Sequence, residues 1–187
     1  MHIMIIPLVR QDRPRVEAHL QRLACADRSL RFAAGLVTDD TISRYVDALN
    51  FEHDLLLGHV SLCGRVIALV HGAVFMLQGQ RHVEAAFSVD AEWRGQGMGR
   101  QLMRAVLART ETTGGGTLVG RCSARNRPMR RLFEHAQCTL TREDDELAAR
   151  RVLDDAGPGQ PKRPCRCQPS AALSAAPAAT AAGSRVR

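Results

Sequence analysis

The chain has 187 residues, of which 45% are hydrophobic, and its formal net charge is +7 at pH 7. This length accommodates one domain with a sizeable core, plus a remainder. No apolar run approaches the 18 residues of a membrane-spanning helix and no signal peptide is apparent, so we expect a cytoplasmic protein without a membrane partner.

The composition divides the chain into a predicted domain, residues 1–155, and a predicted disordered tail rich in alanine and proline, residues 156–187. The tail contains five basic residues and no acidic one, so residues 1–155 carry only +2 of the net charge. A basic face on the domain is therefore not needed to explain the charge, and nucleic-acid binding by the tail is the weaker interpretation. The sequence is compatible with a homodimer but does not specify the oligomeric state.

The first half of the chain is predicted to form a strand, two helices and three strands. Pro14 and an apolar stripe at Val16, Leu20 and Leu23 indicate the first helix, and Thr38 suits the N-cap of the second. The predicted strands cover residues 3–9, 54–62, 65–77 and 81–89, and the helices begin near residues 12 and 38. The last three strands follow one another through short glycine turns, which predicts an antiparallel meander.

The second half is predicted to alternate helices and strands. A helix is expected over residues 101–109, a strand over 117–122, a helix from Asn126, and strands over 139–143 and 147–153. The complete order predicts an α/β (α+β) fold, with a mixed, mostly antiparallel central sheet flanked by about four helices.

A glycine-rich turn, Arg94-Gly95-Gln96-Gly97-Met98-Gly99, joins a predicted strand to a predicted helix. Such a turn presents free backbone N–H groups to a phosphate, and the helix dipole adds partial positive charge. It lacks the Lys-Ser/Thr of a Walker A loop, and its G-x-G-x-G spacing differs from the dinucleotide fingerprint. The alternative is a turn in which glycines only ease packing.

The turn matches Arg/Gln-x-x-Gly-x-Gly/Ala and so resembles the pyrophosphate-binding signature of the GNAT superfamily of N-acetyltransferases. With the element order, the resemblance covers about residues 3–153. It implies a GNAT-like acyl-CoA N-acyltransferase fold and acetyl-CoA as co-substrate. No metal is expected, because the seven histidines show no metal-ligand spacing. It also implies direct acetyl transfer to a primary amine in a ternary complex.

The resemblance implies two sets of cofactor-binding residues and one further contact. The expected pyrophosphate-binding residues are Arg94, Gly95, Gln96, Gly97, Met98, Gly99 and Arg100. The main-chain groups of Phe87, Ser88 and Val89 would bind the pantetheine arm, on a strand that in the family splays from the next one. Asn126 matches a family asparagine that contacts the cofactor, although it also suits a helix N-cap.

Glu84 is the candidate general base. Its neighbours on both faces of the predicted strand are apolar or small, so we expect a half-buried side chain; burial raises the pKa of a carboxyl group toward neutrality. An attacking ammonium must lose a proton before its nitrogen can act, and many family members place a glutamate on this strand for that purpose. The alternatives are an exposed strand-end residue or an ion pair with Arg81 or another arginine.

Phe133 departs from the family pattern. The family usually has a tyrosine seven positions after the asparagine, which protonates the leaving thiolate, and phenylalanine cannot donate a proton. Core packing is the favoured role of Phe133, and water, Ser88, Ser123 and His135 remain possible proton donors.

The acceptor is predicted to be a protein lysine or a small-molecule amine. Leu30-Arg31-Phe32 and residues 38–42 resemble the opening of bacterial members related to protein-lysine acetyltransferases, which slightly favours a lysine. A different class, suggested by Phe133, is an acyl-CoA-sensing module that binds the cofactor without efficient turnover.

Overall fold

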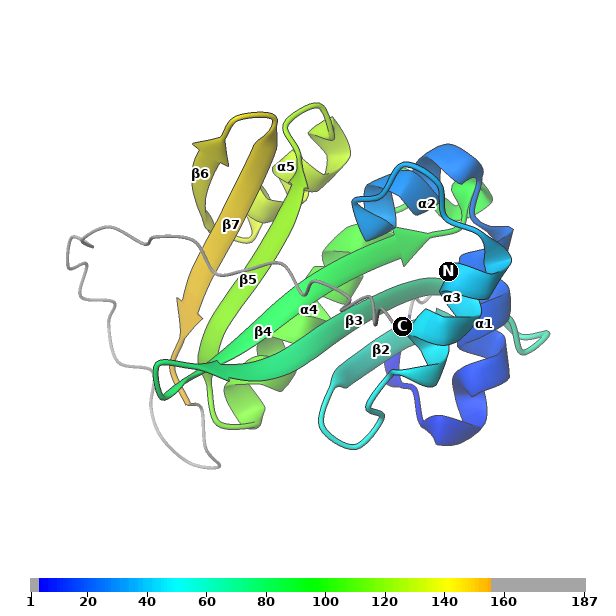
Figure 1. Cartoon of the computed structure of the whole chain (residues 1–187). Coiled ribbons are helices and arrows are strands. Elements are labelled where there is room, and N and C mark those ends of the chain that lie inside the picture. The colour runs from blue at the N-terminus through cyan, green and yellow to red at the C-terminus, as the bar shows by residue number, and fades with distance from the viewer. Residues whose placement is uncertain (1–3, 156–187) are drawn as a thin grey trace, which may run out of the picture.

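Seven strands form one sheet in the computed structural model, which describes residues 4–155 (Figure 1). In chain order they are β1 (Ile6–Pro7), β2 (Leu55–Val60), β3 (Val66–Leu77), β4 (Gln80–Val89), β5 (Gly116–Ser123), β6 (Thr139–Glu143) and β7 (Glu146–Leu153). The spatial order is β1-β2-β3-β4-β5-β7-β6, and every neighbouring pair is antiparallel except the parallel pair β4–β5. The predicted mixed, mostly antiparallel sheet is therefore confirmed.

Helices cover both faces of this sheet. The α-helices are α1 (Arg13–Arg22), α2 (Cys25–Phe32), α3 (Asp39–Asp47), α4 (Met98–Thr112) and α5 (Arg127–His135), with 3-10 turns η1 (Arg10–Asp12) and η2 (Ala91–Trp93). The expected set of helices lacks α2, because this helix buries no residue and has no side-chain N-cap to mark it in the sequence. The predicted tail, residues 156–187, lies outside the described residues. Within residues 4–155, no helix is long and apolar enough to cross a membrane.

Two apolar clusters hold the helices to the sheet. Leu20 of α1 and Ile42 of α3 pack with Leu69 of β3 on one face, and Leu102 of α4 and Phe133 of α5 pack on the other. Figure 1 places α1, α2 and α3 together over the β2–β4 half, with α4 behind the sheet. Among the described residues no helix lies in front of β5 and β7 on the α1-bearing side, so this part of the sheet is open (Figure 1).

Side-chain alternation assigns residues to each face. Val83 and Ala85 of β4 belong to the α4 cluster, so Glu84, Ala86 and Ser88 point to the opposite side. We call that side the α1–α3 face.

The strands β4 and β5 pair over only three positions, His82↔Thr117, Val83↔Leu118 and Glu84↔Val119. Beyond Glu84, β4 is paired only with β3, and Figure 1 shows β5 diverging from it. The Asp90 N–H donates to the Ile67 carbonyl at 2.9 Å, so the main-chain groups at this position of β4 are directed toward β3. In an antiparallel pair alternate residues direct their N–H and C=O groups to opposite edges. Ala85, Phe87 and Val89 therefore direct theirs to the open edge.

Buried polar contacts attach α1 to the end of β4. His19 is fully buried; its Nε2 lies 2.8 Å from Ser88 Oγ and its Nδ1 lies 3.0 Å from Asp90 Oδ1. Arg22 Nη2 donates to Asp90 Oδ2 at 3.0 Å and to the Val66 carbonyl at 2.7 Å. His19 lies three residues after Val16, on the buried stripe of α1. This spacing indicates a buried histidine, which was not among the residues selected from the sequence. These contacts fix the position of the last β4 residues.

Asp90 gives a pH-dependent stability prediction. Burial raises the pKa of its carboxyl group, but hydrogen bonds from His19 and Arg22 lower the pKa more, so the net shift is downward. A depressed folded-state pKa stabilises the fold above the unfolded value of about 3.9, and this stabilisation is lost as the pH falls through the folded-state value. We expect Asp90→Asn to lower the free energy of unfolding by about 1–3 kcal/mol at pH 7. The difference should shrink below about pH 4.

Urea unfolding at pH 7, 4 and 3 measures this difference. Asp40→Asn is the control, because the Asp40 side chain is 75% exposed and its removal should change stability by less than about 0.5 kcal/mol. An Asp90→Asn effect of constant size across this range would contradict the assigned role of the carboxylate.

Candidate active site

The glycine-rich turn lies directly after β4, between η2 and α4. Gly95 and Gly97 have φ angles of 73° and 85°, a left-handed conformation that favours glycine, and Gly97 is the N-cap of α4. Within residues 4–155, the main-chain N–H groups of residues 95–100 meet no hydrogen-bond acceptor. They lie at the positive end of the α4 dipole, which makes this turn suited to an anion.

The side chains of the turn have different surroundings. Met98 is 2% exposed and packs in the core, so only its main chain is available. Gln96 Nε2 donates to the Glu92 carbonyl at 3.1 Å. Gly99 is helical, and a Cβ there would meet Leu132 at an ordinary 3.7 Å. Arg100 lies beside the turn, with its Nη2 3.9 Å from the place of a Gly97 Cβ.

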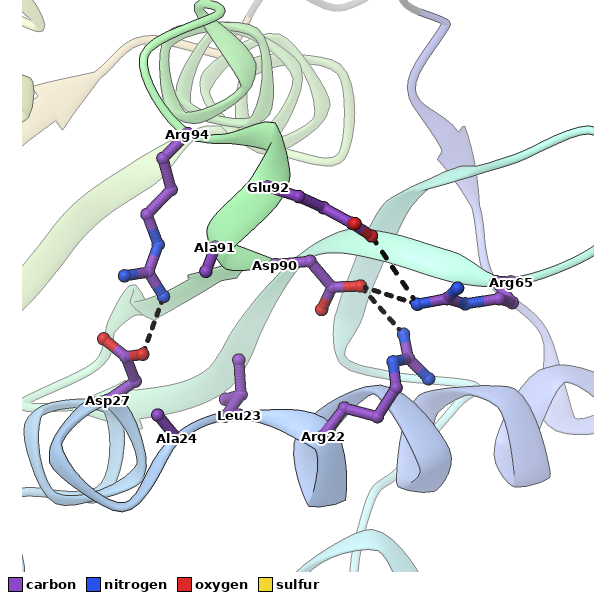
Figure 2. A pocket seen from close by; sticks show the side chains of 9 residues that line it. All are labelled: Arg22, Leu23, Ala24, Asp27, Arg65, Asp90, Ala91, Glu92 and Arg94. Atoms are coloured by element: carbon purple, nitrogen blue, oxygen red, sulfur yellow. Dashed lines mark hydrogen bonds and ion pairs between the residues drawn. The ribbon is translucent and has the colours of Figure 1, made fainter.

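Arg94 connects the turn to α2, a contact that the sequence analysis did not predict. Its Nη2 lies 2.8 Å from Asp27 Oδ2, and its Nε donates to the Val89 carbonyl at 3.1 Å. Figure 2 shows Arg94 reaching across a pocket of about 310 Å3 toward α2. Three arginines and three acids line this pocket: Arg22, Arg65, Arg94, Asp27, Asp90 and Glu92. Its positive and negative charges are therefore balanced.

The open edge of β4 presents main-chain groups near this turn. Phe87 and Val89, two of the three residues expected to offer such groups, direct them to the open edge. Ser88 directs its main-chain groups to β3, and its hydroxyl contacts His19. The main-chain groups of Phe87 and Val89 are thus directed to the open edge, whereas those of Ser88 are directed to β3.

Glu84 occupies the last position at which β4 pairs with β5. Its side chain is exposed, so the expectation of a half-buried carboxylate is wrong. Its strand neighbours Val83 and Ala85 are buried on the α4 side, whereas Glu84 faces the α1–α3 face close to its uncovered part. Among residues 4–155 Glu84 forms no ion pair with an arginine, and Arg81 donates instead to the Gly115 carbonyl and to Thr113 Oγ1. The exposure of Glu84 matches the alternative of an exposed strand residue.

Asn126 and Phe133 lie on the β5 side of the gap. The Oδ1 of Asn126 accepts from the Met129 N–H at 3.1 Å, which confirms its role as the N-cap of α5. Phe133 is fully buried, as expected for core packing. A Cβ at Gly120 would lie 2.7 Å from Phe133 Cζ and 3.5 Å from the Ala85 carbonyl. The far end of the Phe133 ring therefore reaches the base of the gap between β4 and β5.

A polar network on the α1–α3 face also lies beside β4. His71, opposite Ala86 in the register, has its Nδ1 2.6 Å from Tyr45 Oη and its Nε2 3.1 Å from Asp54 Oδ2. Arg31 donates to Tyr45 Oη at 2.8 Å. Burial lowers the pKa of His71, the hydrogen bond with Asp54 raises it and Arg31 lowers it, with a net downward shift. The sequence could not reveal this network, because its members come from distant segments.

No group of three or more His, Cys, Asp or Glu side chains within residues 4–155 is arranged to hold a metal ion.

Comparisons with known proteins agree with this geometry. The model of the Acetyltransferase (GNAT) family matches residues 20–137, more than half of the chain. No curated protein sequence matches.

Solved structures share the fold at low identity. The GNAT domain of S. lividans PAT is 20% identical with a TM-score of 0.67, over 80% of this chain and 89% of that one. A phosphinothricin acetyltransferase of Sinorhizobium meliloti, solved with AcCoA, is 15% identical with a TM-score of 0.63, over 87% and 94%. The Salmonella typhimurium protein yncA, solved with acetyl-CoA, is 16% identical with a TM-score of 0.66, over 89% and 100%. Because the family match spans β4, the glycine-rich turn and Asn126, this chain belongs to the GNAT family of acetyltransferases.

Proposed function

We propose that this chain is an acetyl-CoA-dependent N-acetyltransferase that transfers an acetyl group directly to a primary amine in a ternary complex. One observation carries the proposal: the free N–H groups of residues 95–100 and the open edge of β4 lie at the same end of one strand. A ligand with a pyrophosphate and an extended, amide-bearing arm can contact both. The acetyl-CoA complexes of the Sinorhizobium and Salmonella neighbours support this ligand.

The binding residues have distinct roles in this proposal. The N–H groups of residues 95–100 donate to the pyrophosphate, and Arg100 supplies charge beside them. Phe87 and Val89 pair with the pantetheine amides through their main chains, and Asn126 approaches from the start of α5. An open-edge N–H near the parting of the strands polarises the thioester carbonyl, which acetyl-CoA supplies.

Glu84 is the proposed general base, acting directly or through a water molecule. It takes a proton from the acceptor ammonium, whose nitrogen then attacks the thioester carbonyl carbon; the nitrogen releases a second proton to solvent as the C–S bond breaks and a thiolate leaves. Phe133 cannot protonate this thiolate. Ser88 is hydrogen-bonded to His19, and His135 Nδ1 lies 2.7 Å from the Arg131 carbonyl, so Ser123 and water remain as the donors of this proton.

The acceptor is a small-molecule amine or a protein lysine. The second candidate function is an acyl-CoA-sensing module with weak or no turnover, which the buried Phe133 favours.

Acetyl-CoA should raise the thermal midpoint of the wild-type protein. Ligand at a hundred times its dissociation constant adds about 2.7 kcal/mol, or roughly 5–10 °C for a chain of this size. We expect Gly97→Glu to abolish this shift, because it places a carboxylate at the α4 N-terminus. Gly79→Glu is the control, since Gly79 has a similar φ of 75° and open surroundings in the β3–β4 turn. Equal shifts in both variants would reject the proposed pyrophosphate site.

Glu84→Gln separates the enzyme from the sensing module. The enzyme should lose about 10²–10⁴-fold in kcat, the range for a general base, while its acetyl-CoA affinity stays unchanged. Steady-state release of free CoA with an amine panel measures kcat, and calorimetry measures affinity. Glu111→Gln, on α4 behind the sheet, controls for loss of a charge. Binding without turnover in the wild type would instead support the sensing module.

A further inference from the structure

A second pocket, of about 370 Å3, lies where the start of β4, the start of β5 and the end of β7 meet. Its lining includes Arg81 and Arg150, together with Gln80, Thr117 and Val152, and contains no acidic residue. We call it the basic pocket. Unlike the balanced pocket of Figure 2, it combines two arginines with uncharged residues only.

The basic pocket opens on the same face as Glu84. Leu147, Ala149 and Leu153 of β7 belong to the α4 cluster, so Arg150 and Val152 point to the α1–α3 face. This is the part of the sheet that no described helix covers, and Val152 is 66% exposed. A ligand at the exposed Glu84 and a ligand in the basic pocket therefore share one open surface.

Neither arginine of the pocket is neutralised. Arg150 has no carboxylate within 4.0 Å among the described residues, and its Nε is buried without a hydrogen-bond partner there. Arg81 has the same alternation as Val83 and Ala85, so its side chain points to the α4 side, where it donates to the Gly115 carbonyl and to Thr113 Oγ1; Arg150 is therefore the guanidinium of the pocket on the open face. A buried guanidinium N–H without an acceptor is costly, and a carboxylate is the group that matches it best.

The register sets the distance between this charge and the proposed reaction centre. Glu84 pairs with Val119 on β5, and Val119 pairs with Arg150 on β7, so the three form one row across the sheet. Two strand spacings separate Glu84 from Arg150, about 10 Å between main chains. A ligand that contacts both side chains therefore needs its two charged ends separated by a distance of this order.

We infer that the basic pocket is an anion subsite for the acceptor, with Arg150 as the residue that determines specificity. The acceptor class is a small molecule with a primary amine at one end and a carboxylate at the other. Its ammonium lies at Glu84 and its carboxylate accepts hydrogen bonds from Arg150. The inference rests on the proposed N-acetyltransferase function and narrows its acceptor.

Two probes that differ only at one end test this inference: 6-aminohexanoate and 6-amino-1-hexanol. Calorimetry in the presence of CoA measures the affinity for each probe, and product formation with acetyl-CoA measures kcat/KM. The wild type should prefer the carboxylate by about tenfold or more, the usual advantage of a charge-assisted hydrogen bond. Arg150→Gln should remove the preference without changing the values for the alcohol, and Arg150→Lys should restore part of it.

Arg121→Gln is the matched control. Arg121 lies on the same face of the sheet, but its Nη1 lies 3.8 Å from Glu146 Oε2 and it does not line the pocket. Its loss should therefore leave the preference for the carboxylate probe intact. The subsite would be overturned if the wild type bound both probes with equal affinity, or if Arg150→Gln kept the preference for the carboxylate. Acetyl transfer to a lysine peptide and to neither probe would also overturn it. Acetylation of both probes at equal rates would reject the subsite but keep the acetyltransferase. Preferential binding without product would keep the subsite and reject the transfer function.

Discussion

The parting of β4 and β5 after Glu84 and Val119 is the constraint on which the rest of the site depends. Main-chain N–H and C=O groups in a sheet require partners, and a strand that loses its neighbour must find them elsewhere. Here the neighbour is lost at an interior position of the sheet rather than at its edge. An extended ligand between the two strands can pair with these unpaired N–H and C=O groups.

Packing at the base of the gap maintains this separation. The buried Phe133 ring fits against Gly120 on β5 only because that residue has no Cβ, and the same side of Gly120 faces the Ala85 carbonyl on β4. On the other side, His19 and Asp90 connect the end of β4 to α1. The two strands are thus held by different helices, so their separation is built into the core.

The sequence predicted the features that local chemistry determines. The positive φ angles at Gly95 and Gly97, the N-cap at Asn126 and the apolar stripes all follow from neighbours within a few residues. Features that depend on tertiary arrangement were not predictable. Apolar neighbours on β4 suggested that Glu84 is half buried, but its side chain is exposed, and within residues 4–155 no helix lies over β5 and β7 on that face. The helix α2 contributes no buried side chain, and its contact with Arg94 joins residues 67 positions apart.

Arg94 has a consequence for how the two sides of the site are connected. It holds the carboxylate of Asp27 on α2 and the carbonyl of Val89 on the open edge of β4. A ligand that draws the Arg94 guanidinium toward the turn must break its contact with Asp27. A ligand that pairs with the Val89 carbonyl must displace the Arg94 Nε from that oxygen. The measured affinity of such a ligand therefore includes the free energy of releasing α2, and by thermodynamic reciprocity whatever moves α2 changes that affinity equally. The Arg94 side chain thus couples the position of α2 to ligand binding at the turn and at β4.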